Sequence, residues 1–171
     1  MSRPRALVLT GSLGMGHHVV TEVVADSLEQ MGWSTGMFDC MSMLGRLSGK
    51  AGDWVFRRIM ATPTLYDGVH FSHFRTASRL AALVDWGATK KLVPALTDHL
   101  AREPVDLLVS TFATGASAIA ILGSDGSMAR PPATVALCTD ACMHSLWVRD
   151  GIHLFLARSR RSPPRCSATA T

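Results

Sequence analysis

The sequence predicts an α/β fold in which helices connect the strands of a doubly wound parallel sheet. Short apolar runs, bounded by glycine, proline or polar turns, alternate with longer segments at helical spacing. The first such run ends at a glycine-rich turn, as strand–turn–helix units do. The chain has 171 residues, of which 47% are apolar and 18% are charged, so we expect one well-buried domain.

The first predicted unit is a strand, a turn, a helix and a second strand. Residues 5–10 (RALVLT) predict a buried parallel strand. Residues 18–31 carry apolar side chains at helical spacing, and Gly32 stands where a glycine commonly ends a helix. Residues 34–40 predict the next strand, which completes a βαβ unit.

The later elements continue the alternation. Residues 41–74 are less regular and mix aromatic with basic side chains, and 76–102 predict a helix whose second part Pro94 starts or kinks. The other predicted elements are a strand at 105–111, a helix at 114–122, a loop at 123–132, and strands at 133–139 and 152–157. Residues 158–171, rich in arginine, proline and serine, predict a disordered basic tail, so the folded domain spans 1–157.

Composition excludes several classes of protein. The formal net charge of +4 is mild and lies largely near the C-terminus, and lysines and tyrosines are too few for a nucleic-acid-binding surface. No stretch has the length of a membrane span, and the four cysteines show no disulfide framework of a small secreted protein. These features favour a cytoplasmic protein that is soluble or peripheral at the inner face of a membrane.

A metal centre is not expected. Cys138, Cys142 and His144 have the spacing C-x-x-x-C-x-H, which is not usual for a structural zinc site, and Cys138 lies within an apolar strand. His70 and His73 are three residues apart but have no obvious carboxylate partners. We therefore predict no metal and no cofactor.

The turn TGSLGMGHH, residues 10–18, resembles a dinucleotide-binding fingerprint only in part. Gly14 and Gly16 supply the first two glycines, but Val19 occupies the position of the third. Asp39 ends the second strand, where such a fold contacts ribose. Without the third glycine, we predict a structural role for Asp39.

The same turn lacks the groups of a phosphate-binding P-loop. Gly11 and Gly16 have its spacing, but His17 and His18 stand in place of the lysine and the magnesium-binding hydroxyl. The glycines still allow a tight turn and a close approach of a ligand. The positive end of the following helix disfavours an imidazolium, so a neutral His17 is placed to accept a proton. The alternative is a plain turn whose histidines cap the helix, which we favour for His18 but not for His17.

Three stretches carry a resemblance to a known family. GSLGMGHHVVTEVVADSLEQMGW, EPVDLLVSTFATGASAI and VALCTDACMHSLWV occur in that order. They resemble the glycine–histidine turn, the strand and loop, and the T-D-x-x-x-H-x-x-W segment of one group of enzymes. This group contains the monogalactosyldiacylglycerol synthases and processive diacylglycerol glucosyltransferases, within the wider class of MurG-like enzymes.

The resemblance implies one half of a GT-B glycosyltransferase, a fold of two Rossmann-like domains that face a cleft. In this family the N-terminal domain receives a lipid acceptor, and the C-terminal domain binds most of the nucleotide-sugar donor. The matches cover the N-terminal domain only. We therefore expect the donor domain to be missing through truncation or a frameshift, and the chain alone to be inactive.

The resemblance also implies roles for individual residues. His17 matches the histidine proposed as general base toward the acceptor hydroxyl. Gly14 and Gly16 match the loop that leaves room for the donor phosphates and the acceptor head. Thr111 and Phe112 lie in the strand-and-loop match and are expected to bind substrate.

The third stretch adds three expected substrate-binding residues. Asp140 is expected to orient an imidazole or a hydroxyl, and His144 to contact the acceptor or a phosphate. Trp147 is expected to stack on a sugar or pack against lipid. The alternatives are that Asp140 caps a turn and that Trp147 belongs to the core.

The aromatic and basic side chains of the segment 41–74 give it two interpretations: it docks on a membrane surface, or it packs on the sheet as an ordinary excursion. The resemblance favours docking. The expected partners are thus a nucleotide sugar, a lipid acceptor and a membrane surface, without nucleic acid. The alternative function, from another class, is a non-catalytic Rossmann-like module that binds nucleotides or anionic lipids.

Overall fold

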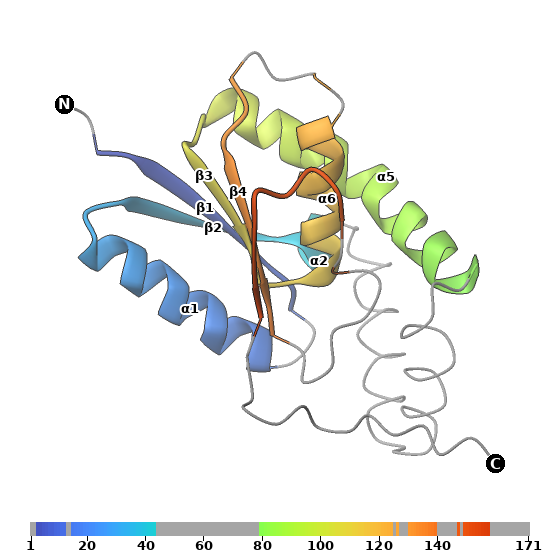
Figure 1. Ribbon diagram of the computed structural model, residues 1–171, viewed down its shortest axis with the longest axis horizontal. Helices are drawn as coiled ribbons and strands as arrows, with labels where there is room; N and C mark the ends of the chain where they lie inside the picture. Colours follow the sequence, from blue (N-terminus) through green and yellow to red (C-terminus); the bar gives the residue numbers. More distant parts are fainter. Residues whose placement is uncertain are drawn as a thin grey trace.

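The computed structural model describes residues 3–12, 15–43, 79–124, 126, 130–139, 147 and 149–157. Five parallel strands form one sheet in the order β2-β1-β3-β4-β5 (Figure 1). The strands are β1 (Arg5–Thr10), β2 (Ser34–Asp39), β3 (Leu107–Ser110), β4 (Ala133–Cys138) and β5 (Leu154–Ala157). The helices are α1 (Met15–Gln30), α2 (Cys40–Met43), α5 (Arg79–Arg102) and α6 (Ala113–Ser124). The predicted α/β, Rossmann-like doubly wound sheet is confirmed.

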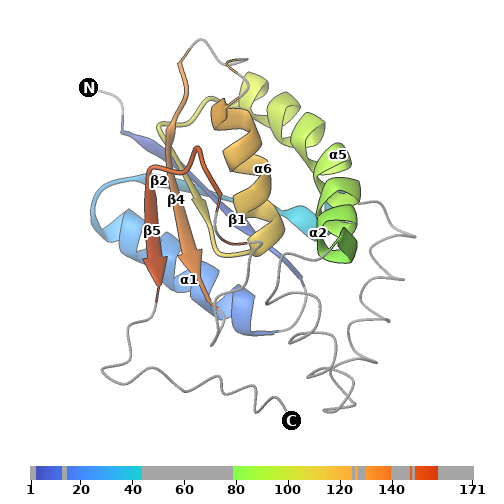
Figure 2. The same ribbon diagram turned by 45° about the vertical axis from the view of Figure 1, so that its right-hand side comes forward.

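The strand order creates a switch point between β1 and β3. From β1 the chain crosses to β2 on one side, and it later returns to place β3 on the other side of β1. Helix α1 covers one face of the sheet, while α5 and α6 cover the opposite face (Figures 1 and 2). In such sheets the connections after two adjacent strands leave in opposite directions, which opens a crevice at their carboxyl ends.

Alternating side chains on β1 supply the core on both faces of the sheet. Leu7 and Leu9 are buried with Leu96 of α5 and Ile119 of α6. Ala6 and Val8 point to the other face, where they pack with Leu28 of α1. A parallel strand covered on both faces needs apolar residues at every position, which explains the continuous run ALVL.

Helix α1 begins three residues before the predicted start, so His17 lies inside its first turn rather than ahead of it. Its end matches the prediction, since Gly32 has a positive φ of 88° and donates its N–H to the Glu29 carbonyl at 2.9 Å. The N–H of Trp33 also donates to the Leu28 carbonyl, at 3.0 Å. These bonds satisfy the last carbonyls of the helix, and the left-handed conformation is one that glycine adopts at low cost.

The other elements are shorter or longer than predicted by a few residues. Each strand after β1 is shorter than expected, so Thr111 and Thr139 lie just beyond the ends of β3 and β4. Helix α5 continues through Pro94, which therefore does not start a second helix. Helix α6 extends to Ser124, into the predicted loop.

Several predictions fall outside the described residues. Of the segment 41–74 only residues 41–43 are described, and the predicted tail 158–171 is not, so the domain limit at 157 stays a prediction. Among the helices of the described part, none is long and apolar enough to cross a membrane.

Gly115 on α6 offers a test of how tightly the helix packs. A Cβ there would lie 2.5 Å from Ser110 Oγ, 3.2 Å from Leu9 Cβ and 3.3 Å from Cys40 Sγ. We expect Gly115→Ala to lower the free energy of unfolding by about 1–3 kcal/mol, measured by urea denaturation, because these atoms belong to the core.

Gly87 on α5 is the matched control, since a Cβ there would meet nothing within 4 Å. Gly87→Ala should leave stability unchanged or raise it by up to about 1 kcal/mol, because alanine is the better helix former. Equal effects of the two substitutions would show that the close contacts at Gly115 are not restrictive.

Candidate functional site

The fold brings residues from three separate segments together at the carboxyl edge of the sheet. His17 comes from the first turn of α1, Thr111 and Phe112 directly follow β3, and Thr139 directly follows β4. We call His17, Thr21, Thr111, Phe112 and Thr139 the switch-point site, because they lie beside the carboxyl ends of β1 and β3. This is where open α/β sheets commonly bind ligands.

Two oxygen atoms contact one nitrogen of the half-buried His17 ring. Nδ1 lies 3.1 Å from the Thr111 carbonyl oxygen and 3.0 Å from Oγ1 of Thr139. The Thr139 hydroxyl also donates to the Thr111 carbonyl, at 3.3 Å. The three groups form a small polar cluster that contacts the ring through Nδ1.

Phe112 packs against both the histidine and the glycine turn. Its ring meets the His17 ring edge to face, with centroids 5.4 Å apart and planes at 80°. A Cβ on Gly11 would lie 2.8 Å from the Phe112 ring. The first glycine of the turn is therefore needed for the close approach of Phe112, which in turn limits the positions open to His17.

A pair of buried threonines fixes the backbone beneath the histidine. The Thr111 N–H donates to the Leu9 carbonyl at 3.0 Å, and its hydroxyl lies 3.1 Å from the same oxygen. The Thr21 hydroxyl lies 2.7 Å from the His17 carbonyl oxygen and 2.7 Å from Thr111 Oγ1. Both threonines are fully buried, so these bonds tie α1, β1 and β3 together without competition from water.

Asp39 holds the glycine turn rather than presenting a free carboxylate. Its Oδ1 accepts hydrogen bonds from the backbone N–H groups of Ser12 at 3.3 Å and Met41 at 2.9 Å. Its Oδ2 accepts one from the Ser12 hydroxyl. The same carboxylate thus anchors the start of the turn and caps α2, in agreement with the predicted structural role.

The other residues predicted from the glycine turn have different positions. Gly16 lies in the first turn of α1, while Gly14 is outside the described residues. His18 is exposed, and its Nδ1 lies 3.8 Å from Oε1 of Glu22. Of the two histidines, His17 contacts residues that follow the neighbouring strands β3 and β4.

The third predicted segment is described only in part. Asp140 and His144 lie outside the described residues. Trp147 is fully buried and packs in a cluster with Ala113, Ala116 and other small residues of α6 and β4. This position agrees with the alternative that Trp147 belongs to the core.

A partly buried ion pair joins Arg149 to the helices α5 and α6. Arg149 donates to Asp85 Oδ2 of α5 at 2.6 Å and to Ser117 Oγ of α6 at 3.2 Å. Burial raises the pKa of Asp85 above its ordinary value, although the Ser117 hydroxyl and the Arg149 charge offset part of this rise. Oδ1 of Asp85 is also buried and has no hydrogen-bond partner among the described residues. The carboxylate is therefore only partly compensated.

The described residues contain no group of three or more histidine, cysteine or carboxylate side chains placed to bind a metal. Cys142 and His144, from the C-x-x-x-C-x-H spacing, lie outside them. Cys40 is buried, and burial raises the pKa of its thiol far above the usual range, so this thiol is not a nucleophile at neutral pH.

Comparison with family models, with curated proteins and with solved structures found no significant match.

Two members of the site, Thr21 and Thr139, were not among the predicted site residues. Thr21 is four residues after His17, so it lies one helical turn along α1. Thr139 ends the apolar run of β4, at the position where a parallel strand presents its next side chain to the carboxyl edge. The spacing of Thr21 from His17 and the position of Thr139 at the end of an apolar run are both visible in the sequence. They indicate a site only when the order of the strands is known.

The Asp85–Arg149 pair predicts a specific pH dependence of stability. Because the pKa of Asp85 is raised above 3.8 in the folded state, folding is favoured while the group is protonated. This contribution is lost as the pH rises through the folded pKa. We therefore expect the free energy of unfolding of the wild type, relative to that of Asp85→Asn, to fall as the pH rises from about 3.8 through the raised pKa of Asp85, measured by urea denaturation.

Asp98→Asn, at an exposed position of the same helix, is the control for removing one carboxylate. If the wild type instead gains stability relative to Asp85→Asn as the pH rises, attraction to Arg149 outweighs the burial of the carboxylate.

Proposed function

We propose that this chain is the acceptor-side domain of a glycosyltransferase that transfers a hexose from a nucleotide sugar to a diacylglycerol-like lipid. The observation that carries the proposal is the position of His17, half-buried at the switch point with one ring nitrogen held by Thr111 and Thr139. A histidine fixed in this way is suited to general-base catalysis.

The proposed reaction needs one proton acceptor on this side of the active site. His17 takes the proton of the acceptor hydroxyl while the hydroxyl oxygen forms a bond to C1 of the sugar. The bond between C1 and the phosphate oxygen breaks, and its electron pair leaves with the nucleoside diphosphate. Removing the proton makes the hydroxyl a better nucleophile, and this effect contributes roughly 10²–10⁴-fold to such reactions.

The meeting of the three family-like stretches supports the proposal. His17 belongs to the first stretch, Thr111 and Phe112 to the second, and Thr139 to the third. Up to 122 positions separate the bonded residues along the chain, yet they lie within hydrogen-bond or ring contact of one another. A resemblance limited to strand-like composition would not require these particular side chains to meet.

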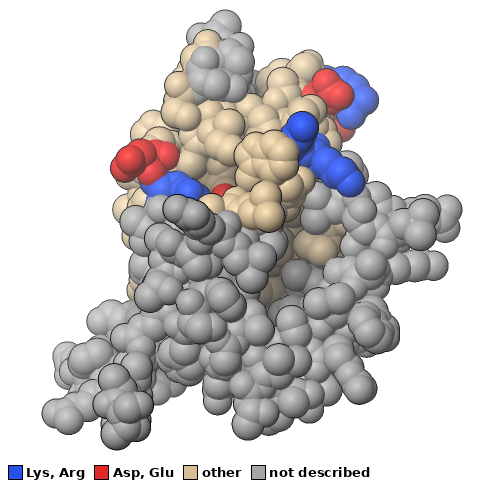
Figure 3. Space-filling view, turned by 90° about the vertical axis from the view of Figure 1, so that its right-hand side faces the viewer, with Lys and Arg blue, Asp and Glu red and all other residues tan. Residues whose placement is uncertain are grey.

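A surface on α5 favours a membrane-resident acceptor. Leu83 and Trp86 are 61% and 59% exposed, and the Lys90 Nζ lies 4.9 Å from the centre of the Trp86 ring. Lys91 is also exposed, and the only acidic residue among positions 82–94 is the buried Asp85. We call Leu83, Trp86, Lys90 and Lys91 the α5 patch; Figure 3 views the side of the molecule on which α5 lies. Apolar and basic side chains together suit an anionic bilayer surface.

The position of the α5 patch relative to the sheet agrees with this role. The residue after α5, Glu103, pairs with Arg5 at the start of β1 at 2.8 Å. The C-terminal end of α5 therefore lies near the start of β1, and its N-terminal end points toward the carboxyl edge of the sheet. Its 24 residues span about 36 Å, whereas the 6 residues of β1 span about 20 Å. The first turns of α5 therefore reach the edge at which His17 lies.

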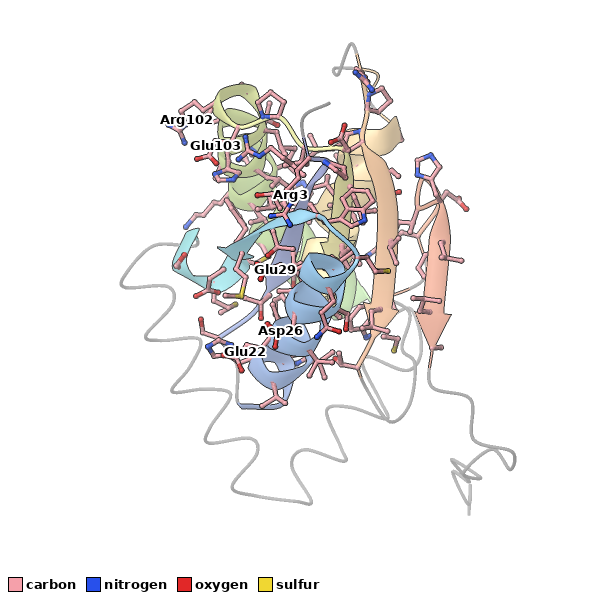
Figure 4. The ribbon with its side chains drawn as sticks, turned by 90° about the vertical axis from the view of Figure 1, so that its left-hand side faces the viewer. Arg3, Glu22, Asp26, Glu29, Arg102 and Glu103 are labelled. Carbon is pink, nitrogen blue, oxygen red and sulfur yellow. The ribbon has the colours of Figure 1, made fainter. Side chains whose placement is uncertain are left out.

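Three acidic side chains lie on the other side of the sheet. Glu22, Asp26 and Glu29 follow one another along the exposed side of α1 (Figure 4). An anionic bilayer would repel this acidic side and attract the α5 patch, which gives the docked domain one preferred orientation.

The function is tested by adding a short-chain diacylglycerol, dioctanoylglycerol, to the 171-residue chain and following the side-chain NMR signals of His17. We expect these signals to shift, and calorimetry to show about tenfold weaker binding for His17→Ala, because one hydrogen bond to the acceptor hydroxyl is lost. In any assay in which the chain supports hexose transfer, His17→Ala should lower the rate by roughly 10²–10⁴-fold.

His18→Ala removes an exposed neighbouring histidine and is the control. Parallel titrations with UDP-glucose and UDP-galactose address the alternative of a nucleotide-binding module. Binding of a nucleotide sugar without any response to diacylglycerol would favour that module, and no response to either ligand would overturn the proposed function.

Docking at a membrane gives a separate prediction for the α5 patch. Trp86→Ala should weaken flotation with vesicles that contain anionic lipid by roughly tenfold, because a large apolar side chain no longer enters the interface. Raising the salt concentration should weaken binding further, because Lys90 and Lys91 contribute by charge.

Val23→Ala on α1 is the matched control, since Val23 is 58% exposed on the other side of the sheet. If Val23→Ala and Trp86→Ala reduce flotation equally, the bilayer does not select the α5 patch.

A further inference from the structure

We propose that Thr139 is a positioning residue which, together with the Thr111 carbonyl, holds His17 in the tautomer that carries its proton on Nδ1, so that Nε2 is the nitrogen that accepts the acceptor proton. The assignment of Nδ1 stands on the contacts of the site. Only the statement that Nε2 acts as the base rests on the proposed function.

The carbonyl of Thr111 decides where the ring proton lies. A carbonyl oxygen can only accept a hydrogen bond, and it lies 3.1 Å from Nδ1. If Nδ1 carried a lone pair instead, two electron-rich atoms would face each other at this distance with no proton between them. The contact is therefore favourable only when Nδ1 is protonated, which leaves the lone pair of the neutral ring on Nε2.

The Thr139 hydroxyl also favours the tautomer with the proton on Nδ1. Its O–H has a carbonyl partner in Thr111 at 3.3 Å, and with its proton placed there Oγ1 presents a lone pair to Nδ1 at 3.0 Å. One consistent arrangement then satisfies all three groups: Nδ1–H donates to both oxygens, and the Thr139 hydroxyl donates to the carbonyl. The opposite tautomer would take the Thr139 proton away from the carbonyl and leave the contact between Nδ1 and Thr111 without a proton.

The remaining contacts restrict rotation of the ring. Phe112 presses on the His17 ring at 80° to its plane. The Thr21 hydroxyl, 2.7 Å from the His17 carbonyl, holds the backbone from which the ring projects. A flip of the ring by a half turn would remove Nδ1 from both oxygens, so the contacts fix the orientation as well as the tautomer.

This arrangement lets the ring gain and lose a proton without rearranging. When Nε2 takes up a proton, Nδ1 is already protonated and keeps both of its acceptors. The same hydrogen bonds therefore serve the neutral base and the imidazolium that forms during the reaction. Dipoles that are already fixed in place need not reorganise during the reaction, and this lowers the cost of forming the imidazolium.

The test reads the tautomer directly from the 171-residue chain by long-range ¹H–¹⁵N NMR of the histidine side chains. The His17 signals are assigned by their absence in His17→Gln. We expect the wild type to show Nδ1 protonated and Nε2 unprotonated in the neutral ring. Thr139→Val should lower the ratio of this tautomer to the other by about tenfold, and Thr139→Ser should restore it, because serine retains the hydroxyl.

Two controls separate positioning from general structural effects. Thr97→Val on α5 removes a half-buried hydroxyl whose only described bond is to the Val93 carbonyl, and should change nothing in the His17 signals. Thr21→Val removes a buried hydroxyl beneath the site. It should lower the midpoint of urea unfolding while leaving Nδ1 protonated, because both oxygen partners of Nδ1 remain.

A wild-type ring protonated on Nε2 would overturn the inference, whatever the variants show. A ring protonated on Nδ1 that is unaffected by Thr139→Val would remove Thr139 from the positioning role. Neither measurement depends on catalysis. A failure of the inference is thus distinguishable from a failure of the proposed function, which would appear as the lack of any response to diacylglycerol.

Discussion

The hydrogen bonds of Thr111 are the interaction on which the candidate site depends. Its N–H and hydroxyl both face the Leu9 carbonyl, its hydroxyl also contacts Thr21, and its carbonyl contacts His17 and Thr139. One residue thus connects β1, α1 and the end of β4 at the point where the direction of the strand connections reverses. Because Thr111 is fully buried, water cannot replace a lost partner, and each unsatisfied group would cost about 1–3 kcal/mol.

The sequence predicted the central strands β1 and β3 well because they are buried on both faces of the sheet. The run at β1 is apolar at four successive positions, so its burial did not depend on knowing which neighbours it has. The glycine turn was also predictable, because glycines between a buried strand and a helical run indicate a tight turn. A functional role of His17 stays a prediction. The boundaries were less accurate: the start of α1 moved to Met15 because the first turn forms across residues that composition assigns to the loop.

What the sequence could not show was which side chains complete the site. Thr139 contacts His17 only because β4 lies next to β3, and Thr21 contacts Thr111 only because α1 returns across the end of β1. Nothing in the local pattern encodes either pairing. Arg149 and Asp85 gave no signal for the same reason, since their partnership arises only where the fold brings Arg149 against α5 and α6. Trp147 fitted both a ligand-binding and a core position, and burial in the fold favours the core.

The long separation between the bonded residues also determines when the site can exist. His17 is 94 positions from Thr111 and 122 from Thr139. During synthesis, at roughly 5–20 residues per second, α1 and β1 emerge well before β3, and β3 before β4. A ribosome-bound chain that ends before β4 carries the glycine turn, His17 and Thr111, but it lacks the Thr139 hydroxyl that contacts the same ring nitrogen. The full set of contacts around His17 therefore forms late in folding, when Thr139 reaches the edge of the sheet.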